Sequence, residues 1–594
     1  MGQDAKGRRT LSSGRQDLQP LHNLRADNPI GIRLDIECAQ PKCDTVIRRL
    51  SSELALTQFC TAGTHQMIMT MVNWFLLASN PARHLRSFRR IRCLSAIMLA
   101  VLWLISAPAA AEPEGTLTIG MHFTPVTRWL DPAEGESTIT PYFLLYALHD
   151  ALLKPMPGVG SGPSLAESWS MSQDMLSAQF TLRPNTKFHN GDPVTGDDVK
   201  FSFERYRGGA AKILKEMVKE IQVLAPDRVR FVFREPWPDF PAFYGTFAAS
   251  AGWIVPRSYV ERVGEDGFRK APIGAGPYKF VSLNPGIELV VEAFEGYWRR
   301  SPSIKRIVFR SLPDETTRAA ALKSGDIDLA MLLTGPVALD IRRTPGLQLT
   351  AALLGIFWLD FPDQWDPTSP WADTRVRMAA NLAIDRQALN EAETLGLSRP
   401  TGNTVPRDFE FALPIDPPPF DPTRAKQLLV EAGYPNGFEG GELAPFPPYN
   451  AMGEAIQGWL AAIGIRTKMR TMERGAFMIA WREKKLHGVV LTISGVSGNA
   501  ATRLEPFVTK NGAFAYGALP EVDDLFRRQA RELDRTKRAA LLHQLQNILR
   551  DQVVQAPIYH LGFPIGVGRR VEDIMTTAIP GFYMSPYEDL KLRP

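Results

Sequence analysis

Alternating apolar and polar residues predict several β-strands in this chain, and stretches with helical spacing lie between them. The run Thr116–His122 alternates and predicts a first strand, and Val229–Phe233 predicts a later one. Apolar positions in Thr374–Leu389 recur at helical spacing, and Pro422–Ala432 predicts another helix that ends at Gly433. Strands and helices that alternate at these lengths predict layered α/β domains.

The first part of the chain has the pattern of a targeting segment. A basic cluster precedes the apolar run Cys93–Ile105, and the small residues Ser106–Ala111 follow it. This order predicts a secretory signal peptide in the region 67–111, cleaved after Ala111, with cleavage after Ala110 as the alternative. The apolar run is short for a bilayer span, although a membrane anchor stays the alternative. Because a signal peptide belongs at the true start of a chain, residues 1–66 are interpreted as a probable non-native extension.

Composition excludes several classes of function once this segment is set aside. The whole chain has 68 Lys and Arg against 63 Asp and Glu, a formal charge of +5. Residues 1–111 hold 14 of the basic and 7 of the acidic residues, so 54 and 56 remain and the balance becomes −2. The charge therefore supports no nucleic-acid partner. All four cysteines lie at or before Cys93, which excludes disulfide and thiolate chemistry after Ala111. A free periplasmic protein fits these features best.

Sequence motifs for catalysis and metal binding are missing. There is no HExxH, no Walker A loop and no G-x-S-x-G, and Gly158–Gly162 lacks the strand and helix of a dinucleotide site. The histidines after Ala111 include no two at metal-ligand spacing, although one of them could touch a metal chelate. The sequence therefore predicts a protein that is not an enzyme and that holds no cofactor and no metal ion directly.

The most informative stretch is Phe180–Arg205, FTLRPNTKFHNGDPVTGDDVKFSFER. A tight turn at Asn190–Pro193 leads to Thr195, which is a suitable N-cap for a helix. The turn and the N-cap predict local structure, but they indicate no function. The order of residues in the stretch, however, resembles the signature of a known family. This is the oligopeptide, dipeptide and nickel-binding family of extracellular solute-binding proteins (family 5, class C periplasmic binding proteins), which feed ABC importers.

Further blocks resemble the same family in the same order along the chain. Ala275 stands where the family has Thr in its Gly-Thr-Gly-Pro-Tyr turn, and Glu295 stands where it has Asn. Together the blocks extend the resemblance over roughly residues 116–560. They are GAGPYKF (274–280), FEGYW (294–298) with SPSIKRI (301–307), DETTRAAALKSGDID (314–328), DTRVRMAANLAIDR (373–386), FDPTRAKQLLVEAGYPNGF (420–438) and GWLAAIGIRTKM (458–469).

The resemblance implies an α/β fold of the three-domain periplasmic-binding-protein type. Two α/β lobes would close over a cleft, and an extra domain would pack beside the first. A ligand that bridges the lobes would stabilise the closed form. By analogy, domain I comprises residues 113–158, 274–350 and 558–594, domain II residues 159–273, and domain III residues 351–557.

The resemblance also suggests residues that contact the ligand. Two of them follow the first strand, two lie on the strand that opens domain III, and three follow the strand near 488–494. Burial in the core is the alternative for the aromatic ones, and a structural role is the alternative for the histidine. The set is His122, Phe123, Phe357, Trp358, Ser494, Gly495 and Val496.

One departure from the family concerns the class of ligand. Peptide-specific relatives usually carry an acidic residue after the strand near 488–494, where it pairs with the α-ammonium of the peptide, but here none appears before Glu505. An ammonium buried without a counter-charge is costly. A capped or modified peptide, an opine-like conjugate, a sugar or another anionic or neutral solute therefore competes with a free peptide.

The partners that the resemblance implies are a small-molecule or peptide ligand and the permease and ATPase subunits of an importer. The protein is expected to be a monomer in the periplasm. A role outside transport, as a sensor partner or a peptide-holding chaperone, stays open on the sequence alone.

Overall fold

The computed structural model describes residues 112–135, 142–245, 251–495, 498–575, 577, 579 and 582–593. The expected extension, the expected signal peptide and Val496 lie outside these residues. Over the described ranges, no helix combines the length and the apolar character that a membrane span requires.

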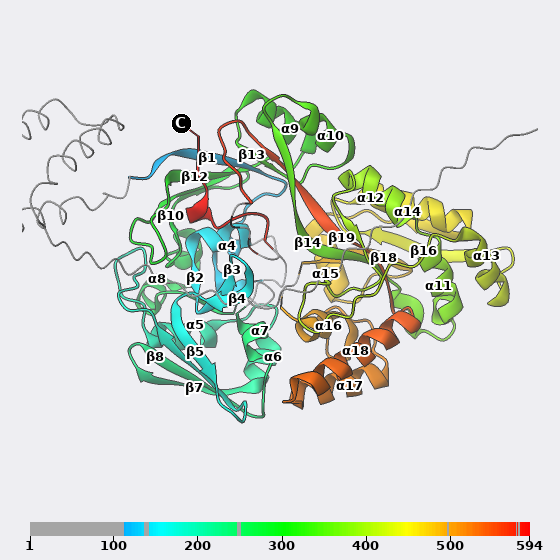
Figure 1. Cartoon of the computed structure of the whole chain (residues 1–594), viewed down its shortest axis with the longest axis horizontal. Coiled ribbons are helices and arrows are strands. Elements are labelled where there is room, and N and C mark those ends of the chain that lie inside the picture. Colours follow the sequence, from blue (N-terminus) through cyan, green and yellow to red (C-terminus); the bar gives the residue numbers. More distant parts are fainter. Residues whose placement is uncertain are drawn as a thin grey trace, which may run out of the picture. The chain divides into compact units, whose positions relative to one another are not determined.

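A large mixed sheet is the main element of this structure (Figure 1). Strand β1 (Glu114–Met121) confirms the predicted first strand, and it pairs in parallel with β12 (Ile304–Ser311) and β13 (Leu329–Met331). The strand order is β10-β11-β12-β1-β13-β19-β14-β18-β16-β17, and β15 pairs with β19. The other strands are β10 (Tyr278–Asn284), β11 (Glu288–Ala293), β14 (Gln348–Asp360), β15 (Arg399–Pro400), β16 (Phe438–Pro445), β17 (Ile465–Met469), β18 (Val489–Ser494) and β19 (Gln555–Val567).

Strands β14 and β19 join the two halves of the large sheet. They pair antiparallel from Gln348↔Val567 to Asp360↔Gln555, and each is 13 residues long. Every residue of β19 is buried. A strand that is covered on both faces does not alternate between apolar and polar residues. This explains the nearly continuous apolar run around Ile558–Val567. The expected domain limits at 350 and 557 fall inside these two strands, so β14 and β19 connect the expected domains I and III.

A smaller antiparallel sheet has the order β5-β6-β8-β7 and its own core. The ring of Phe231 on β8 lies 5.6 Å from Phe180 and 5.1 Å from Phe240, and Phe240 stacks on Tyr244 at 5.1 Å. All four strands lie within 159–273, the range expected for domain II, although the three-domain division itself stays a prediction. They are β5 (Ala166–Met171), β6 (Ser177–Leu182), β7 (Val218–Ala225) and β8 (Arg228–Phe233); the pairs β2 (Asp150–Ala151) with β9 (Trp253–Ile254) and β3 (Leu153–Met156) with β4 (Val159–Pro163) are separate.

The helices begin where side chains can satisfy their first backbone N–H groups. The carboxylate of Asp421 accepts a hydrogen bond from the Arg424 N–H at 2.8 Å, which starts α13, and Thr195 with Asp198 starts α5. The helices are α4 (Tyr142–Leu148), α5 (Gly196–Arg205), α6 (Ala211–Met217), α7 (Phe240–Tyr244), α8 (Arg257–Lys270), α9 (Glu315–Ser324), α10 (Gly335–Arg343), α11 (Thr374–Leu382), α12 (Arg386–Thr394), α13 (Pro422–Glu431), α14 (Asn450–Ala462), α15 (Arg474–Arg482), α16 (Ala500–Val508), α17 (Pro520–Arg531) and α18 (Arg535–Asp551).

The prediction of one helix over Thr374–Leu389 is wrong. The chain forms α11 up to Leu382 and begins α12 at Arg386. Asp385 accepts a hydrogen bond from the N–H of Ala388 at 2.9 Å and so caps a new helix. An aspartate favours a helix start over a helix interior, and this preference outweighs the continuous apolar spacing.

A buried ion pair lies between the small sheet and the large one. Asp150 and Lys154 are 2.9 Å apart, and their side chains are 0% and 1% exposed. The carboxylate of Asp150 also accepts hydrogen bonds from Ser164, from Tyr297 at 3.0 Å and from Trp298 at 2.6 Å. This network satisfies both buried charges and ties residues that are distant in the sequence.

We expect Asp150→Asn to destabilise the protein strongly, because it leaves the Lys154 ammonium buried without a counter-charge. The free energy of unfolding should fall by about 3–5 kcal/mol, measured by denaturant unfolding. Ser164→Ala is the control, since it removes one donor and keeps the pair, and it should lower stability by about 1 kcal/mol. If the Asp150→Asn variant is as stable as the control, the buried ion pair does not stabilise the fold as we expect.

Candidate ligand-binding site

A small cavity lies at the ends of β1 and β18. His122 follows β1, and Ser494 and Gly495 close β18, so three of the residues predicted from the sequence line this cavity of about 60 Å³. Gly355 on β14 is also part of the wall, and a Cβ atom there would lie 2.7 Å from the carbonyl oxygen of Ser494. The approach of β14 to β18 therefore requires glycine. Seven of the lining residues are Phe, Tyr or Trp: Phe446, Tyr449, Trp481, Phe507, Phe514, Phe563 and Tyr583.

Arg474 supplies the positive charge of the small cavity. It is the first residue of α15, and the carbon of its guanidinium lies 5.0 Å from the centroid of the Phe446 ring. Burial lowers the pKa of Arg474 from its ordinary value. Among the described residues that line this cavity, none is Asp or Glu. The lining therefore favours an anionic group over a cationic one.

His122 is a neutral histidine at neutral pH. Burial lowers its pKa well below 6.5, and the positive charges of Arg474 and Arg318 lower it further. Its ring contacts Phe123 edge-on at 5.0 Å and Phe563 at 5.5 Å. Within the described part of the chain, its Nδ1 atom has no hydrogen-bond partner. A neutral ring with one unsatisfied nitrogen can accept or donate one hydrogen bond to a ligand.

The other predicted residues lie elsewhere. Phe123 belongs to the core of the large sheet and is 6% exposed. Phe357 and Trp358 are 0% exposed; Phe357 packs against Tyr449, and the Trp358 indole donates to Asp360 at 2.8 Å. These three residues do not line the small cavity, and Val496 is outside the described residues. Their contact with a ligand stays a prediction.

Sequence analysis missed most of the residues that form the small cavity. Arg474, Trp481 and Phe514 come from α15 and from the loop after α16. Trp481 lies seven positions after Arg474, which places both on one side of a helix. This spacing is a weak signal, since it also fits an ordinary buried helix face.

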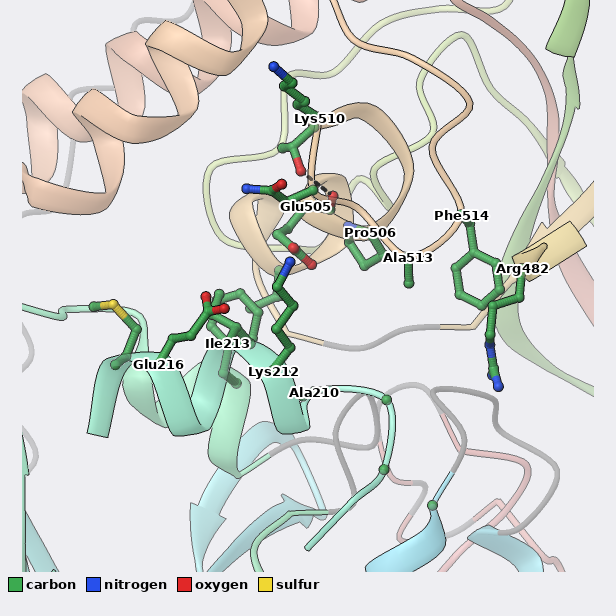
Figure 2. Close-up of a pocket in the computed structure, with 18 of the residues that line it drawn as sticks. Ala210, Lys212, Ile213, Glu216, Arg482, Glu505, Pro506, Lys510, Ala513 and Phe514 are labelled. Carbon is green, nitrogen blue, oxygen red and sulfur yellow. Dashed lines mark hydrogen bonds between the residues drawn. The ribbon is translucent and has the colours of Figure 1, made fainter. Parts of the chain in front are cut away.

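A large cavity of about 920 Å³ lies next to the small one (Figure 2). Residues 207–217, which include α6, form one wall, and residues 502–514 with α17 form another. Phe514 lines both cavities. The two cavities therefore adjoin at this aromatic side chain.

Charged side chains of opposite sign face each other in the large cavity. Lys212 on α6 extends toward the carboxylate of Glu505 on α16 (Figure 2). Burial raises the pKa of Glu505 to about 7, while Lys212 lowers it and Glu216 raises it. Glu505 is consequently poised between its charged and neutral forms near neutral pH.

A buried polar cluster holds the walls of the large cavity together. Asp239, just before α7, forms an ion pair with Arg538 on α18 and accepts a hydrogen bond from the Asn499 amide at 2.7 Å. Asn499 also caps α16, because its side-chain oxygen accepts from the N–H of Thr502 at 3.0 Å. All three polar side chains of the cluster are buried. The start of α16, which carries Glu505, is thus fixed to the range expected for domain II.

The described residues contain no group of three His, Cys, Asp or Glu side chains placed to hold a metal ion.

A family model for bacterial extracellular solute-binding proteins, family 5 (middle region), matches residues 161–515, which is more than half of the chain. The family that the motifs suggested is thereby confirmed. Two similar proteins illustrate the range of the relatives. The chain is 28% identical over 463 residues to heme-binding protein A of Haemophilus influenzae, covering 72% of this chain and 82% of that protein. It is 26% identical to glutathione-binding protein GsiB of Escherichia coli (O1:K1 / APEC), covering 82% and 96%.

Solved structures share the fold. The periplasmic binding protein DppA from Helicobacter pylori, in complex with the peptide STSA, matches with a TM-score of 0.70 and 23% identity, covering 81% of this chain and 98% of that one. AgaA from A. tumefacien R10, in complex with agropinic acid, matches with a TM-score of 0.69 and 24% identity over the same shares. The expected α/β periplasmic-binding-protein fold is confirmed.

We expect Asp239→Asn to loosen the walls of the large cavity, because it leaves the buried Arg538 guanidinium without a carboxylate. The free energy of unfolding should fall by about 3–5 kcal/mol. The radius of gyration in small-angle X-ray scattering should rise as the walls separate.

Glu235→Gln is the matched control for this variant. Glu235 pairs with Arg531 at 3.0 Å between the same two parts of the chain, but both side chains are more than 40% exposed. Removal of this surface pair should change stability by about 0–1 kcal/mol. If the two variants lower the free energy of unfolding equally, the buried cluster stabilises the protein no more than a surface ion pair does.

Proposed function

The chain belongs to the bacterial extracellular solute-binding proteins of family 5, and on this premise we propose that it is the periplasmic component of an ABC importer. It captures a small solute and delivers it to the membrane permease, which an ATPase subunit drives. The protein acts as a monomer, and its signal peptide is removed on export. It catalyses no reaction.

The observation that carries this proposal is the small cavity at the ends of β1 and β18, whose volume of about 60 Å³ suits an end group of a solute. Ligands of open α/β sheets bind beyond the carboxyl ends of the strands, and His122 and Ser494 lie at these ends. The walls come from segments that are far apart in the sequence. A solute that touches both walls stabilises the closed arrangement, so binding shifts the population toward the form that the permease recognises.

The charges of the lining favour a peptide-like or other small solute with an anionic group at Arg474. A peptide with a free α-ammonium finds no carboxylate on the described lining of the small cavity. The aromatic side chains can cover apolar parts of a ligand, and ordered water can complete its polar contacts. The family resemblance suggests four further neighbours of the ligand, which we keep as part of this proposal: Phe123, Phe357, Trp358 and Val496.

A metal chelate is a second candidate ligand. His122 favours it, because its ring is neutral and its Nδ1 atom has no partner among the described residues. NikZ from Campylobacter jejuni, whose fold matches with a TM-score of 0.67, was solved in complex with Ni(L-His). Opines and sugars are further non-peptide candidates. A chaperone or sensory role would use the same cavity without transport.

Native mass spectrometry tests which of these ligands the protein carries. The full chain is expressed and the protein is purified gently from the periplasm. We expect one discrete adduct, with the mass of a single acidic solute, because the lining lacks a carboxylate for a peptide ammonium. A ladder of adducts that fits mixed short peptides with free amino groups would overturn this assignment of ligand class.

Arg474→Gln tests the role of the charge in the small cavity. A lost charge-assisted hydrogen bond should weaken binding of the recovered solute by about 1.5–3 kcal/mol, or about 10- to 150-fold, in isothermal titration calorimetry. Arg424→Gln is the control, since Arg424 is an exposed residue of α13 that pairs with Glu431. Equal affinities of the two variants would remove Arg474 from the site.

A further inference from the structure

We propose that the large cavity is a second compartment of the ligand site, where Lys212 binds an acidic group of the solute. This inference rests on the proposed function and narrows the class of ligand. Arg474 in the small cavity and Lys212 in the large one would each hold one acidic group. The solute is then one with at least two acidic groups, such as two carboxylates, on a body long enough to pass Phe514.

The two cavities are neighbours through shared elements. Phe514 lines both of them, and on α15 Trp481 lines the small cavity while the next residue, Arg482, lines the large one. Figure 2 shows Phe514 and Arg482 close together at one end of the large cavity. Phe514 itself is 6% exposed and packs against Trp481 at 4.4 Å and Phe507 at 5.5 Å, so the wall between the cavities is built of aromatic rings.

The lining of the large cavity has an excess of positive charge. Among the described residues that line this cavity, six are Lys or Arg and four are Asp or Glu, and two of the four acidic side chains already have partners. Glu134 pairs with Arg207 and Arg269, and Asp523 accepts a hydrogen bond from the backbone N–H of Lys510 at 2.9 Å. The basic residues are Arg128, Arg207, Lys212, Arg482, Lys510 and Arg527; the acidic ones are Glu134, Glu216, Glu505 and Asp523.

Lys212 is placed to receive an acidic group on the wall formed by α6. Its side chain is exposed to the cavity, and in the described part of the chain it makes no salt bridge within 4.0 Å. It extends from α6 toward Glu505 on the opposite wall (Figure 2). Arg207, by contrast, is held by Glu134 and Glu265 at 2.7 and 2.8 Å. An ammonium without a fixed partner can exchange water for a ligand carboxylate at little cost.

Glu505 controls the availability of Lys212. When Glu505 is ionised, it attracts Lys212 and repels an acidic ligand group; when it is protonated, it does neither. The pKa of Glu505 is raised to about 7 by burial, with Lys212 and Glu216 as the charged groups of α6 that face it. An anionic group bound nearby raises this pKa further, so binding takes up a proton. The affinity is therefore highest below pH 7 and falls as the pH rises through it.

The experiment compares three probes that differ in the number of free carboxylates. They are N-acetyl-Ala-Ala-amide with none, N-acetyl-Ala-Ala with one and succinyl-Ala-Ala with two, one at each end. Isothermal titration calorimetry with the periplasmic protein, at pH 6 and pH 8, measures each affinity. We expect the two-carboxylate probe to bind about 10-fold or more tightly than the one-carboxylate probe at pH 6. Its affinity should fall about 10-fold at pH 8, as Glu505 ionises.

Two variants assign these effects to their residues. Lys212→Gln should remove the advantage of the second carboxylate and leave the one-carboxylate probe unaffected. Glu505→Gln should abolish the pH dependence and keep the tighter affinity at pH 8. Lys215→Gln is the matched control, because Lys215 is an exposed residue of the same helix that does not line the cavity. Thermal unfolding of each variant verifies that it is folded.

Each contrary result has a definite meaning. Weaker binding by Glu505→Gln would show that Glu505 holds a cationic group of the ligand, and it would overturn the inference. Equal affinities of the one- and two-carboxylate probes would do the same. If no probe binds after the native adduct has been removed, the inference is overturned, while the proposed function stands on the adduct. Absence of both adduct and probe binding would count against the proposed function itself.

Discussion

The antiparallel pairing of β14 with β19 is the constraint on which the rest of the structure depends. It lies between β13, which pairs with β1, and β18, so it fixes the distance between the two strand ends that carry His122 and Ser494. The register places Ile356 opposite both Ser494 and His560. Because backbone hydrogen bonds along both strands define this register, the small cavity is determined by main-chain geometry as much as by its side chains.

Several charged side chains of this molecule are buried, where the surroundings have a low dielectric constant. The pairs Asp150–Lys154 and Asp239–Arg538 are buried with additional hydrogen bonds, which is the condition under which buried charges are tolerated. Arg474 and Glu505 lie at cavity walls, and burial disfavours the charged form of each. An anionic ligand group favours the charged form of Arg474 and the neutral form of Glu505, so binding and protonation become linked.

Local patterns predicted much of the fold, and their failures have a physical cause. Asp421 and Gly433 correctly marked the ends of α13, because capping depends on residues within one turn. The same rule, applied to Asp385, would have divided Thr374–Leu389 into α11 and α12, but the apolar spacing concealed the break. Of the residues that line the small cavity, His122, Ser494 and Gly495 were predicted through the family resemblance, whereas Arg474 carried only a weak local signal and Phe514 carried none.

The sequence by itself determined the α/β class, most of the predicted strands and helices and the lack of a carboxylate after β18, since these depend on residues close together in the chain. Its separated motifs, taken in order, determined the family. Only the tertiary structure decided that Lys212 faces Glu505 and that Asn499 bonds to Asp239, 260 positions away. Such contacts depend on how distant segments pack, and many surface lysines and glutamates have the same local sequence signature. Packing brings particular ones together and removes them from water, which gives them their chemistry.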